Sequence, residues 1–121
     1  MIINITNNKT IEELQAEFNN EFPYLKIQFF KHSHKMFKGS EKKELIPVST
    51  PIGILKHHNG SIEISENMTV NELEMLFKQK LGLNIQVFRK SGRSWLETTV
   101  TDNWTLKKQN DEGKELSVLE I

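Results

Sequence analysis

Hydrophobic residues recur along this chain with two different periods. Isoleucines alternate with polar residues over 2–6 and again over 61–65, and a period of two is typical of a strand with one buried face. Further along each stretch, large apolar residues recur every three or four positions, which predicts two amphipathic helices. These positions are Ile11, Leu14, Phe18 and Phe22 in the first helix and Val70, Leu73, Phe77 and Leu81 in the second. A strand is predicted after each helix, over 25–32 and 84–90.

Each predicted helix also carries a start signal. Thr10 and Thr69 precede the apolar stripes, and Glu13 and Glu72 stand three residues further on. At this spacing the hydroxyl and the carboxylate can each accept a hydrogen bond from the other residue's backbone N–H, an arrangement called the capping box. We therefore expect both helices to begin directly after a threonine.

The two halves of this pattern are copies of one sequence. Residues 3–22 align with 62–81 and, after a one-residue shift, 26–33 align with 84–91; 11 of the 28 aligned positions are identical. Chance would give about two. Two consecutive strand–helix–strand units are the content of a ferredoxin-like fold. The sequence therefore predicts an α+β two-layer sandwich, with one sheet, two helices on one of its faces and extra C-terminal strands.

The segments outside the two copies are predicted as follows. The stretch 33–50 shows no clean period and is rich in lysine, which indicates a basic loop. After the second copy we expect a turn at 91–93, a strand around 95–100, a short helical turn near 105–110 and a last strand over 115–121. The whole chain, 1–121, is then one domain with an internal repeat at about 2–33 and 61–91 and C-terminal strands within 94–121.

A second architecture fits the C-terminal part of the chain. Residues 52–57 and 61–65 can form a hairpin around Asn59-Gly60, a dipeptide suited to a type I′ turn. With the following helix and the Leu106-to-Val118 ending, residues 51–121 resemble the order of elements in a ubiquitin-like β-grasp fold. The repeat favours the ferredoxin-like alternative, because the pattern of 55–60 parallels that of 106–113 and predicts a short helix in both places.

Composition changes this picture mainly by exclusion. The chain has 121 residues, no cysteine, and equal numbers of basic and acidic side chains, 16 of each. The lack of cysteine excludes disulfides, thiolate metal sites and a thiol nucleophile. No signal peptide and no apolar run long enough to cross a bilayer is visible, so we expect a cytoplasmic protein without a membrane partner.

Patterns for catalysis and metal binding are weak. The sequence has no nucleophile elbow, phosphate loop or dinucleotide fingerprint, so neither enzymatic activity nor a cofactor is predicted. His32, His34, His57 and His58 lie in the basic middle of the chain, where two pairs could bind Zn or Ni if the fold brought them together. A His-x-His spacing without carboxylates is more typical of surface histidines, and no metal site is predicted.

The strongest functional expectation concerns the second face of the predicted sheet. If Ile27 and Ile85 point at the helices, the strand period sends their neighbours to the opposite face. That face would expose five aromatic and amide side chains: Phe30, Phe88, Trp95, Gln28 and Gln86. Exposed apolar patches usually mark contact surfaces, so these residues are predicted to bind a protein partner or a second copy in a homodimer. Alternatively, 33–50 or the C-terminal strands cover this face and make the rings a second small core.

A competing expectation comes from the distribution of charge. Cations interleave with aromatic residues in 29–38 and 88–93, and the basic segments 31–43 and 89–93 could bind an anionic ligand or single-stranded nucleic acid. The residues concerned are Lys31, Lys35, Lys38, Arg89, Lys90 and Arg93. A dedicated nucleic-acid binder usually has a basic domain, whereas the net charge here is zero. The sequence therefore favours a non-catalytic interaction or self-association module, with anion or nucleic-acid binding as the alternative.

Overall fold

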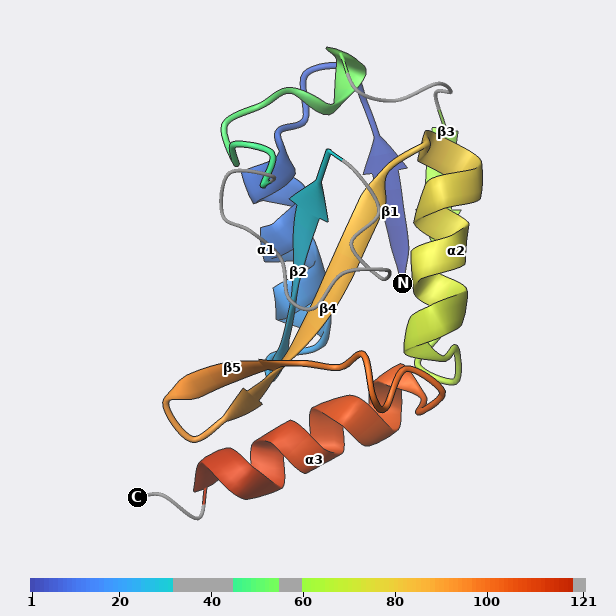
Figure 1. The fold of residues 1–121 in the computed structure, drawn as a ribbon. Coiled ribbons are helices and arrows are strands. Elements are labelled where there is room, and N and C mark those ends of the chain that lie inside the picture. Colours follow the sequence, from blue (N-terminus) through green and yellow to red (C-terminus); the bar gives the residue numbers. More distant parts are fainter. Residues whose placement is uncertain (32–44, 55–59, 119–121) are drawn as a thin grey trace.

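The structure, a computed structural model, describes residues 1–31, 45–54 and 60–118. Within these ranges the chain is a mixed α+β protein with three α-helices and two antiparallel sheets (Figure 1). The elements follow in the order β1 (Ile2–Ile5), α1 (Ile11–Glu21), β2 (Leu25–Phe30), the 3-10 helix η2 (Ile52–Ile54), β3 (Gly60–Glu63), α2 (Val70–Leu81), β4 (Asn84–Ser91), β5 (Ser94–Glu97) and α3 (Leu106–Val118).

Both helices of the repeat begin where the capping signals predict. The Glu13 backbone N–H donates to Thr10 Oγ1 over 3.2 Å, and the Thr10 N–H donates to Glu13 Oε1 over 3.1 Å. The corresponding bonds between Glu72 and Thr69 measure 3.1 and 3.0 Å. Each box satisfies two N–H groups that a helix start leaves without intrahelical partners. The prediction of both helix starts is confirmed.

The strands form two sheets, whereas the sequence predicted one. β1 pairs with β3, and a separate sheet has the order β2–β4–β5; every pairing is antiparallel. A ferredoxin-like sandwich would unite the four strands of the repeat in one sheet, so the single-sheet expectation is corrected. The hydrophobic period assigns each strand a buried face but does not select its neighbour, because strand pairing depends on contacts distant in sequence.

Each strand pair of the repeat is centred on equivalent residues of the two copies. Ile3 lies opposite Ile62 between β1 and β3, and Gln28 lies opposite Gln86 between β2 and β4. Equivalent residues face each other in the same way in the self-complementary interface of a two-fold homodimer. The two copies therefore associate within one chain much as two subunits would.

The structure extends the repeat beyond the alignment found in the sequence. In each copy, a segment after the second strand returns to the start of the helix and forms four backbone hydrogen bonds there. They join Ile11 to Thr50, Glu12 to Val48, Ile52 to Lys9 and Gly53 to Asn7 in the first copy, and Val70 to Trp104, Asn71 to Asp102, Leu106 to Met68 and Lys107 to Glu66 in the second. Ile52 thus corresponds to Leu106, and both are fully buried.

Among the residues that it describes, the structure does not contain the hairpin that the β-grasp alternative predicts between 52–57 and 61–65. Ile52–Ile54 forms a 3-10 helix, and β3 pairs with β1 instead of with the segment before it. The predicted Asn59-Gly60 turn falls largely on 55–59, outside the described residues. Gly53 lies so close to Asn7 that an added Cβ would stand 2.6 Å from its carbonyl oxygen, which fixes glycine at this position.

A single core lies between the helices and the two sheets. The apolar stripes of α1 and α2 are buried together with the inward residues of the strands. Helix α1 contacts β2, α2 contacts β4, and α3 lies across the lower end of the sheet in contact with β4 and β2 (Figure 1). The strand residues in this core include Leu25, Ile27 and Phe29 of β2 and Ile85 and Val87 of β4.

The C-terminal end differs most from the prediction. The expected strand over 115–121 is wrong as far as the described residues reach, because α3 continues to Val118. Its packed face carries Leu106, Gln109 and Gly113, and the backbone of Gly113 lies against Tyr24 and Arg89. A helix stripe made of glutamine and glycine has no apolar period, and this is why the pattern did not indicate it.

Candidate functional site

The candidate site is the face of β2–β4–β5 that points away from the core. Because successive strand residues alternate between faces, Lys26, Gln28 and Phe30 of β2 lie opposite the inward Leu25, Ile27 and Phe29. The register places Lys26 opposite Phe88 and Lys90 opposite Trp95. We call this side the outer face, and its strand residues also include Gln86 and Glu97. The predicted assignment of residues to this face agrees with the register.

Two of the predicted partner-binding residues are buried on this face. Phe30 and Gln86 are each 1% exposed. Phe30 forms an isolated bridge with Leu45, and Gln86 donates to the Val87 carbonyl oxygen and accepts from the Thr99 hydroxyl. The expectation that both are exposed anchors is therefore corrected. Segments adjoining the strands fill this half of the face, which was the alternative left open by the sequence.

The other half of the outer face holds a compact set of four half-buried side chains, which we call the cationic–aromatic patch: Lys26, Phe88, Lys90 and Trp95. Lys26 Nζ lies 4.8 Å from the centroid of the Trp95 ring and 5.6 Å from that of Phe88. Lys90 Nζ lies 5.1 Å from the Trp95 centroid. Two ammonium groups thus converge on one indole, within the range at which a ring face attracts a cation.

The two ammonium groups of the patch repel each other. Burial lowers the pKa of Lys26 from its ordinary value, and the charge of Lys90 lowers it further. Glu97, opposite Phe88 on β5, is an acidic neighbour on the same face. An anionic group placed between Lys26 and Lys90 would relieve their mutual repulsion.

A groove of about 400 Å³ continues from the patch toward α1. Its wall includes Trp95 and Lys26 at one end and Glu12 and Val48 at the other. The floor is the outer edge of β2, whose backbone carbonyls are already engaged. Gln15 Nε2 donates to the Ile27 oxygen over 2.8 Å, and Asn19 Nδ2 donates to the Leu25 oxygen over 2.8 Å.

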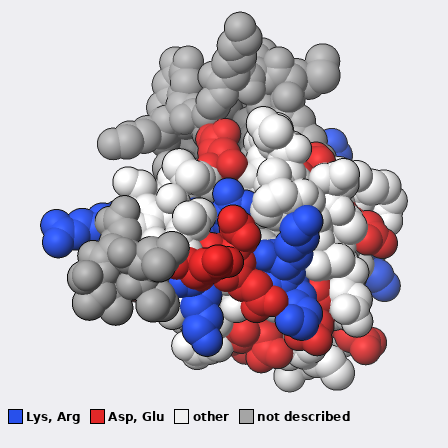
Figure 2. Space-filling model, turned by 90° about the horizontal axis from the view of Figure 1, so that it is seen from below, with Lys and Arg blue, Asp and Glu red and all other residues white. Residues whose placement is uncertain are grey.

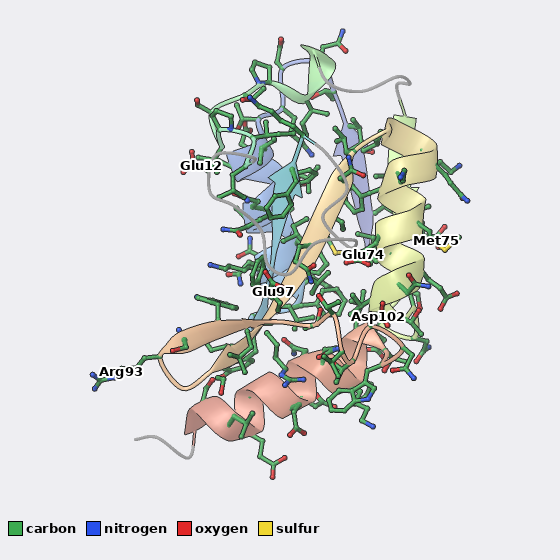
Figure 3. All side chains as sticks on the ribbon, viewed as in Figure 1. Glu12, Glu74, Met75, Arg93, Glu97 and Asp102 are labelled. Carbon is green, nitrogen blue, oxygen red and sulfur yellow. The ribbon has the colours of Figure 1, made fainter. Side chains whose placement is uncertain are left out.

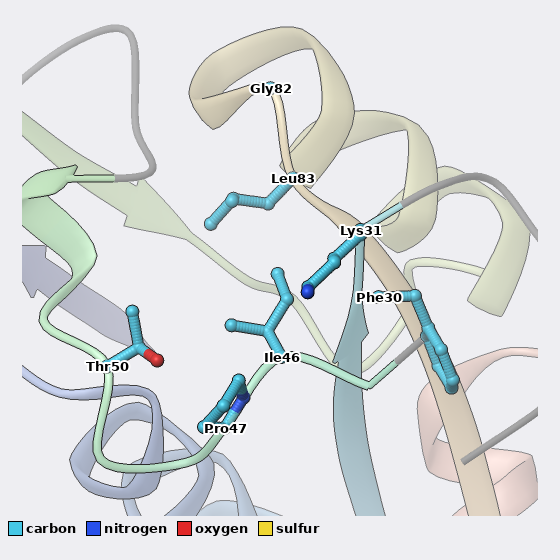
Figure 4. A pocket seen from close by; sticks show the side chains of 7 residues that line it. All are labelled: Phe30, Lys31, Ile46, Pro47, Thr50, Gly82 and Leu83. Carbon is cyan, nitrogen blue, oxygen red and sulfur yellow. The ribbon is translucent and has the colours of Figure 1, made fainter. Parts of the chain in front are cut away.

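A second cavity, of about 360 Å³, lies at the far end of β2 (Figure 4). It is lined by Phe30, Lys31, Ile46, Pro47, Thr50, Gly82 and Leu83. The Lys31 side chain points toward Ile46 in this view. The lining combines one ammonium and one hydroxyl with apolar groups and provides no paired polar chemistry, so this cavity adds no second candidate.

The predicted anion-binding residues are not gathered into one surface. Lys90 belongs to the outer face, whereas Arg89 points the other way, where its Nη1 donates to Gln109 Oε1 over 2.9 Å and its guanidinium stacks 5.4 Å from the Trp104 centroid. Arg93 projects from the tip of the β4–β5 hairpin (Figure 3). Lys35 and Lys38, like all four histidines, lie outside the described residues. Viewed from below, basic and acidic side chains alternate over the surface (Figure 2).

Sequence analysis overlooked Lys26 and the contribution of α3. The strand period places Lys26 on the face of Gln28 and Phe30, but the predicted binding residues did not include it. Gln109 of α3 is fully buried; its amide donates to the Thr101 carbonyl and hydroxyl, and its oxygen accepts from Arg89. This network links α3 to β4 directly beneath the patch.

Comparisons with protein-family models, curated proteins and solved structures gave no match for this chain. Within the described ranges, no helix has the length and apolar character needed to span a membrane. Nor does the described part of the chain bring three histidine, aspartate or glutamate side chains together as a candidate metal site.

Proposed function

We propose that this protein is a non-catalytic binding module whose cationic–aromatic patch recognises an acidic segment of a partner protein. The observation that carries the proposal is the convergence of Lys26 and Lys90 on the half-buried ring of Trp95. Tryptophan presents a large rigid surface, and the paired ammonium groups add a preference for carboxylate. Aromatic residues are enriched at the centres of protein interfaces.

The groove beside α1 supports the same function by extending the contact area. An acidic side chain seated between the two lysines would direct the adjoining residues of the partner along Val48 toward Glu12. Because Gln15 and Asn19 occupy the carbonyls at the edge of β2, the partner would be recognised by its side chains, not as an added strand.

Fluorescence anisotropy with a labelled peptide of alternating glutamate and phenylalanine tests this proposal. Trp95→Ala should weaken binding about tenfold or more, as expected for a central aromatic anchor. Replacing Lys26 and Lys90 together with methionine should weaken it and flatten its dependence on salt, since the screened charge pairs are removed. Methionine keeps most of the side-chain volume.

The matched control replaces Lys78 and Lys80 on α2, both exposed, with methionine. This control removes the same charge elsewhere and should leave the affinity for the peptide unchanged. Equal loss in both double variants would show that only net charge matters and would contradict the proposal. A single-stranded oligonucleotide that bound more tightly than the peptide would instead support the nucleic-acid alternative.

A further inference from the structure

The two edges of the β2–β4–β5 sheet differ in how their backbone groups are satisfied. At the outer edge of β2, the carbonyls of Leu25 and Ile27 accept bonds from α1, and that of Phe29 accepts from the Ile46 N–H over 2.9 Å. At the opposite edge, no described strand pairs with β5 on the side away from β4. A strand edge in this state can pair with another chain.

The register identifies which backbone groups lie on this second edge. The Thr98 N–H donates to the Val87 carbonyl over 3.2 Å, so residue 98 turns its backbone groups toward β4. Bonded and non-bonded positions alternate along an antiparallel ladder, so Leu96 does the same. The N–H and C=O groups of Trp95 and Glu97 therefore point away from β4, toward the outer edge.

The charges at the two ends of β5 are complementary to those of a reversed copy. Glu97 is the last residue of β5, and Arg93 lies in the hairpin turn directly before its first residue, Ser94. Both side chains are exposed, and Arg93 projects from the tip of the hairpin (Figure 3). If two β5 strands pair antiparallel with Trp95 opposite its copy, each Arg93 lies opposite the Glu97 of the other chain.

We propose that β5 pairs antiparallel with β5 of a second copy of this chain, centred on Trp95, to form a two-fold dimer with one continuous six-stranded sheet. Two symmetric Arg93–Glu97 contacts fix this register, because opposite charges directly across a ladder are favourable and like charges are not. Leu96 of β5, which is 44% exposed, adds apolar surface on this strand. Strand β1 carries no charged residue and β3 carries only Glu63, so neither is self-complementary in this way.

Sedimentation velocity across a micromolar to millimolar concentration range tests the dimer and its register. The wild-type chain should show a reversible monomer–dimer equilibrium. Arg93→Glu and Glu97→Arg should each weaken dimerisation roughly tenfold, because each change places like charges at both symmetric contacts. The double variant carrying both substitutions should restore the wild-type equilibrium.

Lys80→Glu on α2 makes the same change of charge as Arg93→Glu and should leave dimerisation unaffected; melting temperatures confirm that each variant is folded. A wild-type chain that stays monomeric throughout the range would overturn the proposal. Single variants that dimerise like the wild type would also overturn it. So would a double variant that does not regain wild-type dimerisation, because the Trp95-centred register places residue 93 of one chain opposite residue 97 of the other. The readout is independent of the acidic-peptide test, which uses different substitutions.

Discussion

Lys26 shows how burial and charge act together on one side chain. Its ammonium lies between two rings, and partial burial together with the charge of Lys90 lowers its pKa below the ordinary value of 10.5. Between the lowered pKa and that ordinary value, the unfolded chain binds more protons at this lysine than the folded chain does. Lys26 therefore makes the free energy of unfolding rise with pH across this interval.

Replacing Lys90 with glutamine should raise the pKa of Lys26 toward its ordinary value, because the repelling charge is removed while burial remains. An NMR titration of the Lys26 Cε resonance measures this directly. Lys108→Gln serves as the control, since Lys108 stacks on Trp104, below the sheet. An unchanged Lys26 pKa in Lys90→Gln would mean that the two ammonium groups do not interact across Trp95.

Phe30 and Gln86 show the limit of sequence reasoning at the scale of single residues. Strand alternation assigned both to the correct face, because the period of two is a property of the backbone. It could not reveal their burial, since Phe30 is bridged by Leu45 and Gln86 is bonded by Thr99, residues that lie outside the two strands. The same alternation contained Lys26, whose importance emerges only from its contacts with Trp95.

At the scale of elements, α1 both covers the core and closes an edge of the sheet. Gln15 and Asn19 donate to successive outward carbonyls of β2, which protects a strand that would otherwise be open to pairing. The apolar stripe of α1 was evident from its spacing. The amides on the neighbouring face gave no such signal, because their role depends on where β2 lies.

Gln15→Glu should destabilise the protein by about 1–2 kcal/mol at neutral pH, because a carboxylate cannot donate to the Ile27 carbonyl. The adjacent carbonyl disfavours the charged form and raises the glutamate pKa in the folded chain. The lost stability should therefore return as the pH falls toward about 4, where the protonated acid can donate. Urea denaturation at both pH values measures this; Gln15→Ala, which removes the bond without adding a titrating group, should show no such recovery.

Helix α3 shows the opposite case, an element whose packing contradicts its sequence pattern. Its buried positions include Gln109 and Gly113, where an apolar stripe would be expected. Gly113 is required because an added Cβ would stand 2.9 Å from the Tyr24 Cβ. Helix α3 packs through close backbone approach at Gly113 and a hydrogen-bond network at Gln109. Neither kind of contact produces a periodic hydrophobic pattern in the sequence.

At the scale of the whole molecule, the internal repeat organises the fold as a dimer within one chain. Duplication of the strand–helix–strand unit was readable from identities, and with it the capping boxes and buried stripes. The sequence did not predict that β2 pairs with β4, because different strand pairings can bury the same faces. Strand β5 and the length of α3 then make the two halves unequal, and the cationic–aromatic patch lies on one side only.

The central claim is that the cationic–aromatic patch binds an acidic segment of a partner protein. Backbone amide NMR during titration with the glutamate–phenylalanine peptide tests this claim most directly. Saturable shifts should concentrate on Lys26, Phe88, Lys90 and Trp95, including the Trp95 indole N–H, and continue along α1 beside the groove. These shifts should be lost in Trp95→Ala at the same peptide concentration. Shifts confined to α3 or to the β1–β3 sheet, or no saturable shifts at all, would contradict recognition by the patch.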